Sequence, residues 1–402
     1  MPQSVVSTVI DQLAEELSRS VVINDPAVQM LYTSAHYGDE DPVRVRALLN
    51  HGAEPRARGH VLAQGVSNWT RAGLIPPDMD IGMHARVCVP IRFEGELLGL
   101  LMVMDADGSI TTAELGRVNE VAQELAYALH DSREEASPGS QDEQLVLDLV
   151  GTDPSARRSA IATMNGSGRG ERFTAVTAVD IRVAGPTTTT RPHVEIALRN
   201  ALSARPRADK TDSMFAVTGE SAVLLVGSQP RNPQPVSRRV GQILDRTHEL
   251  ASGRFRCVAG LGSTGDGLDH ASRSLAQANL ACRAAALGLG DEVTPWESLG
   301  AYGPLLLIPP EHLSEALLPH PLQQLRAIDA DGHLAATLRA YLDSAGNGPA
   351  AAEQLHIHRT SLYYRLGRIH ELAGLDVADG HTRQAVHAGF AMLDIIQARS
   401  QS

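Results

Sequence analysis

The segment 348–369, GPAAAEQLHIHRTSLYYRLGRI, restricts the fold more than any other part of this chain. Asn347 or Gly348 can cap a helix, and Pro349 suits its first turn because no N–H is needed there. Small side chains on one face of this helix would let a second helix cross it closely. That face contains Ala351, Ala352 and Leu355.

A second helix is predicted from about residue 359 to residue 372. His356 and Ile357 form the turn before it, with Ile357 filling the gap between the helices. The second apolar face has spacings of four, three and three residues, which is helical. It consists of Leu362, Leu366, Ile369 and Leu372. Two short helices joined by so tight a turn predict a helix-turn-helix, whose second helix enters the DNA major groove.

If that apolar face packs in the core, a group of polar side chains at the start of the second helix must point outwards. Arg359 is the first candidate for a bidentate contact to guanine. Thr360 and Ser361 can reach base edges, phosphates or a thymine methyl group, and the rest suit phosphates and positioning. The predicted DNA-binding residues are His358, Arg359, Thr360, Ser361, Tyr363, Tyr364, Arg365 and Arg368.

The charge distribution permits a nucleic-acid partner although the whole chain carries a net charge of -12. Residues 1–132 hold 18 Asp and Glu against 9 Arg, a net of -9. Residues 338–370 hold four Arg against one Asp and one Glu, a net of +2. Only the end that would contact phosphate is locally basic.

The amino-acid sequence of residues 338–376 gives further support to this prediction. The stretch contains YLD, then Asn347, an Ala-rich helix, HRTSLYYRL and a final GLD. It closely resembles the C-terminal domain of the PucR/CdaR family of bacterial transcriptional regulators. The resemblance implies DNA binding, and it implies a degenerate GGDEF-like module in the middle of the chain.

The chain departs from that family pattern at the second helix. Thr360 and Ser361 replace Asn-Thr, which can alter base preference. Tyr363 and Gly367 stand where basic residues are common in the family, and a glycine costs roughly 1 kcal/mol of helix propensity against alanine. Two missing cations predict weaker phosphate attraction and a shallower salt dependence.

Residues 1–132 are predicted to form an N-terminal domain. It opens with a helix at 5–17 and ends with a helix at 112–129. Between them, RVCVPIRFEGELLGLLMVM (86–104) is a β-hairpin turning at Glu94-Gly95. The whole resembles a GAF domain, a small-molecule sensor with a six-stranded antiparallel sheet. The helix 112–129 either pairs with its copy in a dimer or packs on its own domain.

Residues 133–143 are charged and contain Ser, Gly and Pro without an apolar period, so they are predicted to be a linker. Residues 144–300 follow as a second domain. Strands are predicted at 173–183, 213–218, 221–226 and 254–262, and helices at 193–202, 236–250 and 267–287. That β-α-β-β-α-β-α order is the split βαβ arrangement of ferredoxin-like folds, and it resembles the GGDEF-like module. Residues 301–402 are predicted to be helical.

The hairpin tip of the second domain argues against catalysis. An active diguanylate cyclase carries Gly-Gly-Asp/Glu-Glu-Phe there, whereas this chain has Thr218, Gly219, Glu220 and Ser221. A metal site for triphosphate chemistry usually needs more than one carboxylate. We therefore expect no cyclase activity and no cofactor. The alternative, a nucleotide-handling enzyme, would make Glu220 essential.

Other candidate sites have simpler explanations. His356, His358 and His370 lack a carboxylate or cysteine to complete a zinc site. GLGSTG (260–265) follows a strand, but no acidic residue closes a second strand about 20 residues later, so a tight strand-to-helix turn is expected. Cys88, Cys257 and Cys282 are too far apart for a metal knuckle and are expected to be reduced and buried.

Four residues near the N-terminal hairpin could line a ligand pocket or belong to the core: Trp69, His84, Arg86 and Cys88. No ligand site is predicted from them.

The sequence thus predicts a multidomain α+β protein of three parts: a GAF-like α/β sandwich, a ferredoxin-like middle domain and an all-α helix-turn-helix domain. The expected function is transcriptional regulation controlled by a small-molecule effector. The expected partners are double-stranded DNA, the effector and a second or further copy of the chain. Without a signal peptide or a transmembrane segment, the expected location is cytoplasmic. An alternative is a sensor or scaffold whose helical domain binds only protein.

Overall fold

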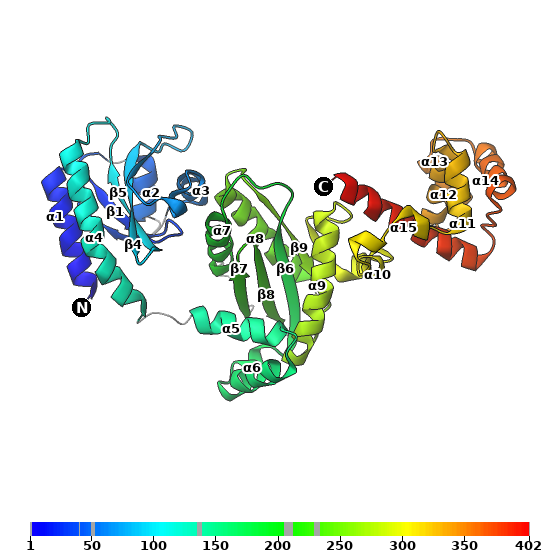
Figure 1. Cartoon of the computed structure of the whole chain (residues 1–402), viewed down its shortest axis with the longest axis horizontal. Helices are drawn as coiled ribbons and strands as arrows, with labels where there is room; N and C mark the ends of the chain where they lie inside the picture. Colours follow the sequence, from blue (N-terminus) through cyan, green and yellow to red (C-terminus); the bar gives the residue numbers. More distant parts are fainter. Residues whose placement is uncertain are drawn as a thin grey trace. The chain divides into compact units, whose positions relative to one another are not determined.

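The computed structural model describes residues 2–39, 41–49, 53–134, 139–204, 212–228 and 234–401. The chain divides into two compact units, residues 1–282 and residues 283–402. Figure 1 shows the elements of each in sequence colours.

The first unit begins with a five-stranded antiparallel sheet in the order β2-β1-β5-β4-β3. The predicted hairpin is confirmed, with residues 94 and 95 at its turn. The GAF resemblance implied six strands, and the described residues show five. The elements are α1 (Pro2–Leu17), β1 (Val21–Asn24), β2 (Met30–Thr33), α2 (Pro42–Leu49), α3 (Pro55–Ala63), β3 (Gly73–Ile75), β4 (Arg86–Phe93), β5 (Glu96–Met104) and α4 (Thr112–Glu134).

Helices α1 and α4 cover one face of this sheet and lie side by side (Figure 1). Ile10 and Leu13 of α1 and Leu125 of α4 are at most 1% exposed, and they share one core with strand residues such as Val89 and Leu101. The predicted helix at 112–129 therefore packs on its own domain. The exposed side of α4 carries mostly polar side chains.

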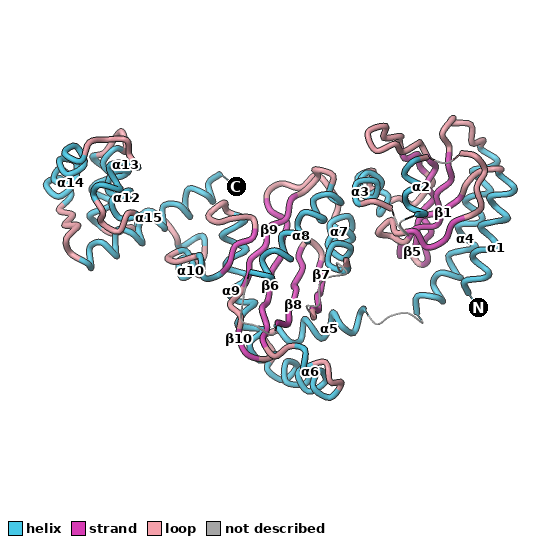
Figure 2. The backbone as a smooth tube through the Cα atoms, turned by 180° about the vertical axis from the view of Figure 1, so that it is seen from behind, coloured by secondary structure: helices cyan, strands magenta, loops and turns pink. Residues whose placement is uncertain are grey.

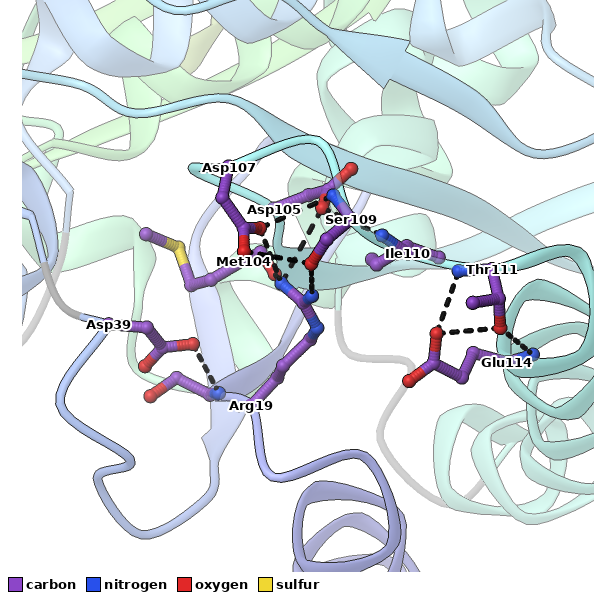
Figure 3. A network of polar contacts seen from close by, with 10 residues as sticks. Arg19, Asp39, Met104, Asp105, Asp107, Ser109, Ile110, Thr111 and Glu114 are labelled. Atoms are coloured by element: carbon purple, nitrogen blue, oxygen red, sulfur yellow. Dashed lines mark hydrogen bonds and ion pairs between the residues drawn. The ribbon is translucent and has the colours of Figure 1, made fainter.

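A polar network holds the start of α4 in place (Figure 3). Thr111 and Glu114 form a capping box: the Glu114 carboxylate accepts from the Thr111 N–H at 2.7 Å, and the Thr111 hydroxyl accepts from the Glu114 N–H at 3.3 Å. Arg19 reaches across from the end of α1 and donates to the carbonyl of Met104 at 3.2 Å and to Asp107 at 3.3 Å. These contacts anchor the loop between β5 and α4.

The predicted linker is only partly correct, because α5 already begins at Gly139. Its helix continues to Val150, and Val146 and Leu149 are fully buried in a core with β6 and β7. Asp142 in its first turn pairs with Arg169 at 2.7 Å, and a carboxylate there is favoured by the helix dipole. The last five residues of the predicted linker, 139–143, are therefore the start of a helix that packs on the domain.

The second sheet of this unit has the strand order β9-β6-β8-β7, with β10 paired to β6. This is the predicted split βαβ arrangement. Helices α7 and α8 pack against each other beside it, and Figure 2 shows the sheet from behind. The elements are α6 (Pro154–Gly166), β6 (Ala175–Ala184), α7 (Arg191–Ser203), β7 (Ser213–Thr218), β8 (Ser221–Ser228), α8 (Gln234–Ala251), β9 (Arg256–Leu261), β10 (Gly265–Asp266) and α9 (Ala271–Ala286).

The glycines of GLGSTG let α9 approach the sheet closely. A Cβ on Gly260 would lie 2.1 Å from the carbonyl oxygen of Ala278, and one on Gly262 would lie 1.9 Å from that of Ser274. The connection from β9 to α9 is longer than the predicted tight turn, because β10 and a short 3-10 helix lie between them. The motif therefore serves packing in this fold.

The second unit is almost entirely helical. Its core contains a group of crossing helices, α11 to α15, around the buried residues Leu338, Leu362 and Ile369. Its elements are β11 (Val293–Pro295), α10 (Tyr302–Leu305), α11 (His320–Ile328), α12 (His333–Asp343), α13 (Gly348–Gln354), α14 (Arg359–Ala373) and α15 (Gly380–Gln401).

Candidate nucleic-acid interface

Hydrogen bonds between nearby residues define both ends of helix α13. The Asn347 side chain accepts a hydrogen bond from the Ala350 N–H at 3.2 Å, so the predicted cap is confirmed. At the other end, His356 has a φ of +54°, and its N–H donates to the carbonyl of Glu353 at 3.0 Å. The N–H of Ile357 donates to the carbonyl of Ala352 at 3.0 Å, which completes a Schellman motif. The turn of the helix-turn-helix is therefore this motif.

Helix α14 follows after His358, whose imidazole accepts from the Thr360 N–H at 3.3 Å and caps the helix. The predicted core face is correct at three of its four positions, and Leu372 is wrong because its side chain is 43% exposed. Ala373 lies in the core instead, at 3% exposure. Successive residues of a helix are about 100° apart, so only one of the neighbours Leu372 and Ala373 can continue the apolar face that packs in the core.

Six of the predicted DNA-binding residues are exposed and, within the described part of the chain, make no hydrogen bond or ion pair to another helix: His358, Arg359, Thr360, Ser361, Tyr364 and Arg368. Tyr364 is 70% exposed. Within the described residues, the Arg359 guanidinium has no hydrogen bond or ion pair. Arg368 pairs with Glu371 of the same helix at 2.8 Å. This set surrounds the start and the outer face of α14.

The other two predicted residues, Tyr363 and Arg365, contact neighbouring helices. The Tyr363 hydroxyl lies over the start of α13, where a Cβ on Gly348 would be only 2.4 Å from it. The Arg365 guanidinium donates to the hydroxyl of Thr337 on α12 at 3.2 Å. Sequence reasoning did not single out Thr337, and no local pattern marks a contact between residues 28 positions apart.

An ion pair between α12 and α15 stabilises α12, the helix on which α13 and α14 pack. Arg339 of α12 donates to both oxygens of Asp394 on α15, at 2.6 Å each. The Tyr302 hydroxyl donates to the same carboxylate at 2.7 Å. Burial, followed by the Asp394 carboxylate, raises the pKa of Tyr302 to about 12. Helix α12 is thus tied to α15 on one side and to α14 on another.

The four residues near the N-terminal hairpin do not gather at one cavity. Arg86 lines a small pocket and pairs with the fully buried Asp41. Cys88 is fully buried in the sheet, and burial raises the pKa of its thiol to about 12. The Trp69 ring covers Gly73, and His84 lies two residues before β4 and does not line that pocket.

Three family models match separate segments of this chain. Residues 334–392 match the PucR C-terminal helix-turn-helix domain, which spans α12 to α15 up to residue 392. Residues 172–284 match the GGDEF-like domain, and residues 7–129 match the GAF domain. The three matches occur in the order that the sequence predicted.

Two characterised relatives are regulators. The chain is 22% identical over 402 residues to the proline-responsive transcriptional activator PutR of Bacillus subtilis (strain 168), covering 94% of each chain. It is 29% identical over 163 residues to the carbohydrate diacid regulator of Escherichia coli (strain K12), covering 39% of this chain and 40% of that one.

The chain carries the three domains of a PucR/CdaR-type transcriptional regulator.

In this regulator, α13 and α14 are the helix-turn-helix of the PucR-type domain. A solved structure, the regulator of polyketide synthase expression from Bifidobacterium adolescentis, matches at 19% identity and a TM-score of 0.28, covering 64% of this chain and 98% of that one. Among the helices of the described residues, none is long and apolar enough to cross a membrane.

Proposed function

We propose that this regulator binds operator DNA through the start and the outer face of α14, with Arg359 contacting a guanine in the major groove. The supporting observation is the position of Arg359. Its guanidinium is exposed at the first turn of α14 and unpaired within the described residues. The same helix is anchored in the core by Leu362, Leu366 and Ile369. An arginine presented by an anchored helix is the arrangement that direct readout requires.

The test is selection of preferred sequences from random DNA by the full chain and by Arg359→Ala. The wild-type chain should enrich a motif containing a guanine, and the variant should lose the preference at that position. Arg326→Ala is the matched control, since Arg326 lies on α11 in a pair with Glu315. Enrichment of the same motif by Arg359→Ala would reject this role. Absence of any enriched motif, together with capture of a protein partner, would favour a scaffold.

The effector is proposed to bind in a small pocket of about 40 Å³ in the N-terminal domain. Strand β1 contributes Asn24, which is 5% exposed and, among the described residues, donates to the sulfur of Met102 at 3.4 Å. A thioether is a weak acceptor, so this lining residue keeps hydrogen-bonding capacity for a polar group of the effector. Most other lining side chains are apolar: Val22, Val28, Met30, Val43, Ala47, Ala53, Ala57, Val61, Met83 and Met102.

Flexible methionines can repack around a ligand, which allows an occupant larger than the unfilled space. The names of the two relatives supply the first compounds to test, proline and a carbohydrate diacid. A compound that changes the DNA affinity of the wild-type chain should lose its effect in Ala47→Leu, which fills the cavity. It should keep its effect in Ala113→Leu, on the exposed side of α4. An unchanged response in Ala47→Leu would place the effector elsewhere.

The middle domain is proposed to act without catalysis. The relatives are transcriptional regulators, and the β7–β8 hairpin carries a single carboxylate, Glu220, at its tip. Among the described residues, no group of three His, Cys, Asp or Glu side chains could hold a metal. Incubation with nucleoside triphosphates and Mg²⁺ or Mn²⁺ should give no turnover. Turnover that Glu220→Ala abolishes would establish an enzyme.

A homo-oligomer in the cytoplasm completes the proposal. One helix-turn-helix buries little surface on DNA, so family members of this architecture need paired half-sites and at least two copies. Sedimentation of the chain with and without an operator should give two or more copies per DNA. A complex of one copy with full affinity would reject this part.

A further inference from the structure

Arg365 has a different environment from the other two arginines of α14. Its side chain is partly buried, and its Nη1 donates to Thr337 Oγ1 at 3.2 Å. Thr337 is 0% exposed in the middle of α12. Its hydroxyl donates in turn to the carbonyl of His333 at 2.7 Å. The Thr337 hydroxyl therefore donates a hydrogen bond within its own helix and accepts one from Arg365.

The geometry of α14 accounts for this contact. Arg365 directly precedes the buried Leu366, so it lies at the edge of the core stripe rather than opposite it. Tyr363 lies on the other side of the helix and reaches Gly348 of α13. Between these two edges, the outward face is left to residues such as Thr360, Tyr364 and Arg368. Two polar side chains thus hold the two edges of the helix against α12 and α13.

We infer that Arg365 is a positioning residue: its bond to Thr337 sets the orientation of α14 on α12, and it contributes to operator recognition through that orientation rather than through a phosphate contact. This inference rests on the proposed DNA-binding role of α14. It assigns the guanidinium of Arg365 to a contact between helices of the domain, which leaves Arg359 and Arg368 as the arginines of α14 that face DNA.

The salt dependence of binding separates the two roles. Each phosphate that an arginine neutralises contributes about 0.9 to the slope of log K against log salt concentration. Arg365→Met keeps the aliphatic stem and removes the charge. If Arg365 only positions the helix, this variant should lose affinity for the operator several-fold and leave the slope and the affinity for random DNA unchanged. If Arg365 contacts a phosphate, the slope should fall by about 0.9 and random DNA should also bind more weakly.

Thr337 provides the matched half of the experiment. Thr337→Val removes the acceptor with almost no change of shape and should weaken operator binding as Arg365→Met does. Thr337→Ser keeps the hydroxyl and should restore the wild-type affinity. The double variant should be no weaker than either single one, because both remove one bond. Additive losses, or a Thr337→Val chain with wild-type affinity, would overturn the inference.

Hydrogen exchange of the full chain without DNA keeps the test independent of the proposed function. Amides of α12 and α14 should exchange faster in Arg365→Met and in Thr337→Val, and at the wild-type rate in Arg359→Met. Unchanged exchange in both variants would overturn the positioning role even if DNA binding holds. Faster exchange in a chain that does not prefer any DNA would instead reject the proposed function and leave the contact established.

Discussion

Arg339 of α12 and Asp394 of α15 form a bidentate pair, with both hydrogen bonds at 2.6 Å. The carboxylate is 16% exposed, whereas the guanidinium is 41% exposed and also lies over the Phe390 ring. Burial raises the pKa of the Asp394 carboxyl, but the hydrogen bonds from Arg339 and Tyr302 outweigh it and hold the pKa below its ordinary value. Because α12 also supports α14, this pair contributes to the rigidity of the DNA-binding unit.

Asp394→Asn should lower the stability of the C-terminal unit by about 1–2 kcal/mol at pH 7, a range that allows for the solvent screening of Arg339. A lowered pKa in the folded state stabilises the fold above about pH 4, the value of an unfolded aspartate, and this contribution is lost as the pH falls through the folded value. The difference between variant and wild type in thermal denaturation should therefore shrink below pH 4. The exposed neighbour Asp343→Asn is the control and should change little. Equal effects of the two variants would contradict the assignment.

His356→Gly should stabilise the helix-turn-helix by about 1 kcal/mol, because a left-handed conformation is costly for residues with a Cβ. Hydrogen exchange of the α13 and α14 amides measures the change as greater protection. His356→Ala keeps the Cβ and should give no such gain. If glycine left protection unchanged or reduced it, the turn would not have the Schellman geometry described above.

Asp180 in β6 offers a test in the middle domain. It is 2% exposed, and burial raises the pKa of its carboxyl to about 6 despite the opposing charge of Arg182. The folded state therefore favours the neutral acid, and ionisation costs stability as the pH rises from about 4 to above 6. Asp180→Asn should raise the thermal stability at pH 7.5, by about 1–3 kcal/mol, and much less at pH 4.5.

The exposed Asp269→Asn serves as the control for this substitution, since the same chemical change on the surface should leave stability unaltered at both pH values. A destabilised Asp180→Asn at pH 7.5 would mean that the pair with Arg182 outweighs the cost of burying the charge.

Much of the fold could be predicted because periodicity and capping are local. The cap at Asn347, the helix from Arg359 and the hairpin turn at Glu94 all follow from neighbouring residues. The error at Leu372 has a physical reason: size favoured leucine, but the geometry of the stripe requires the residue one place later. In the predicted linker 133–143, charged residues concealed the start of α5, whose apolar residues Val146 and Leu149 follow the linker and pack in the domain core.

The candidate site was less predictable than the helices that carry it. Its eight residues were chosen because they face outward from the second helix. That criterion takes no account of contacts with neighbouring helices. Arg365 reaches Thr337 and Tyr363 reaches Gly348 through contacts that depend on how three helices cross. Spacing within one helix carries no information on such crossings.

The most direct test of the account is the coupling between Arg359 and one guanine of the selected operator. Replacing that guanine by 7-deazaguanine removes the N7 acceptor and keeps the base pair. The account predicts that the wild-type chain loses about 1–3 kcal/mol of binding free energy on this change, and that Arg359→Ala binds both DNAs equally. If the modified base weakened the wild type and Arg359→Ala to the same extent, Arg359 would not read that guanine, and the proposed role of α14 would be contradicted.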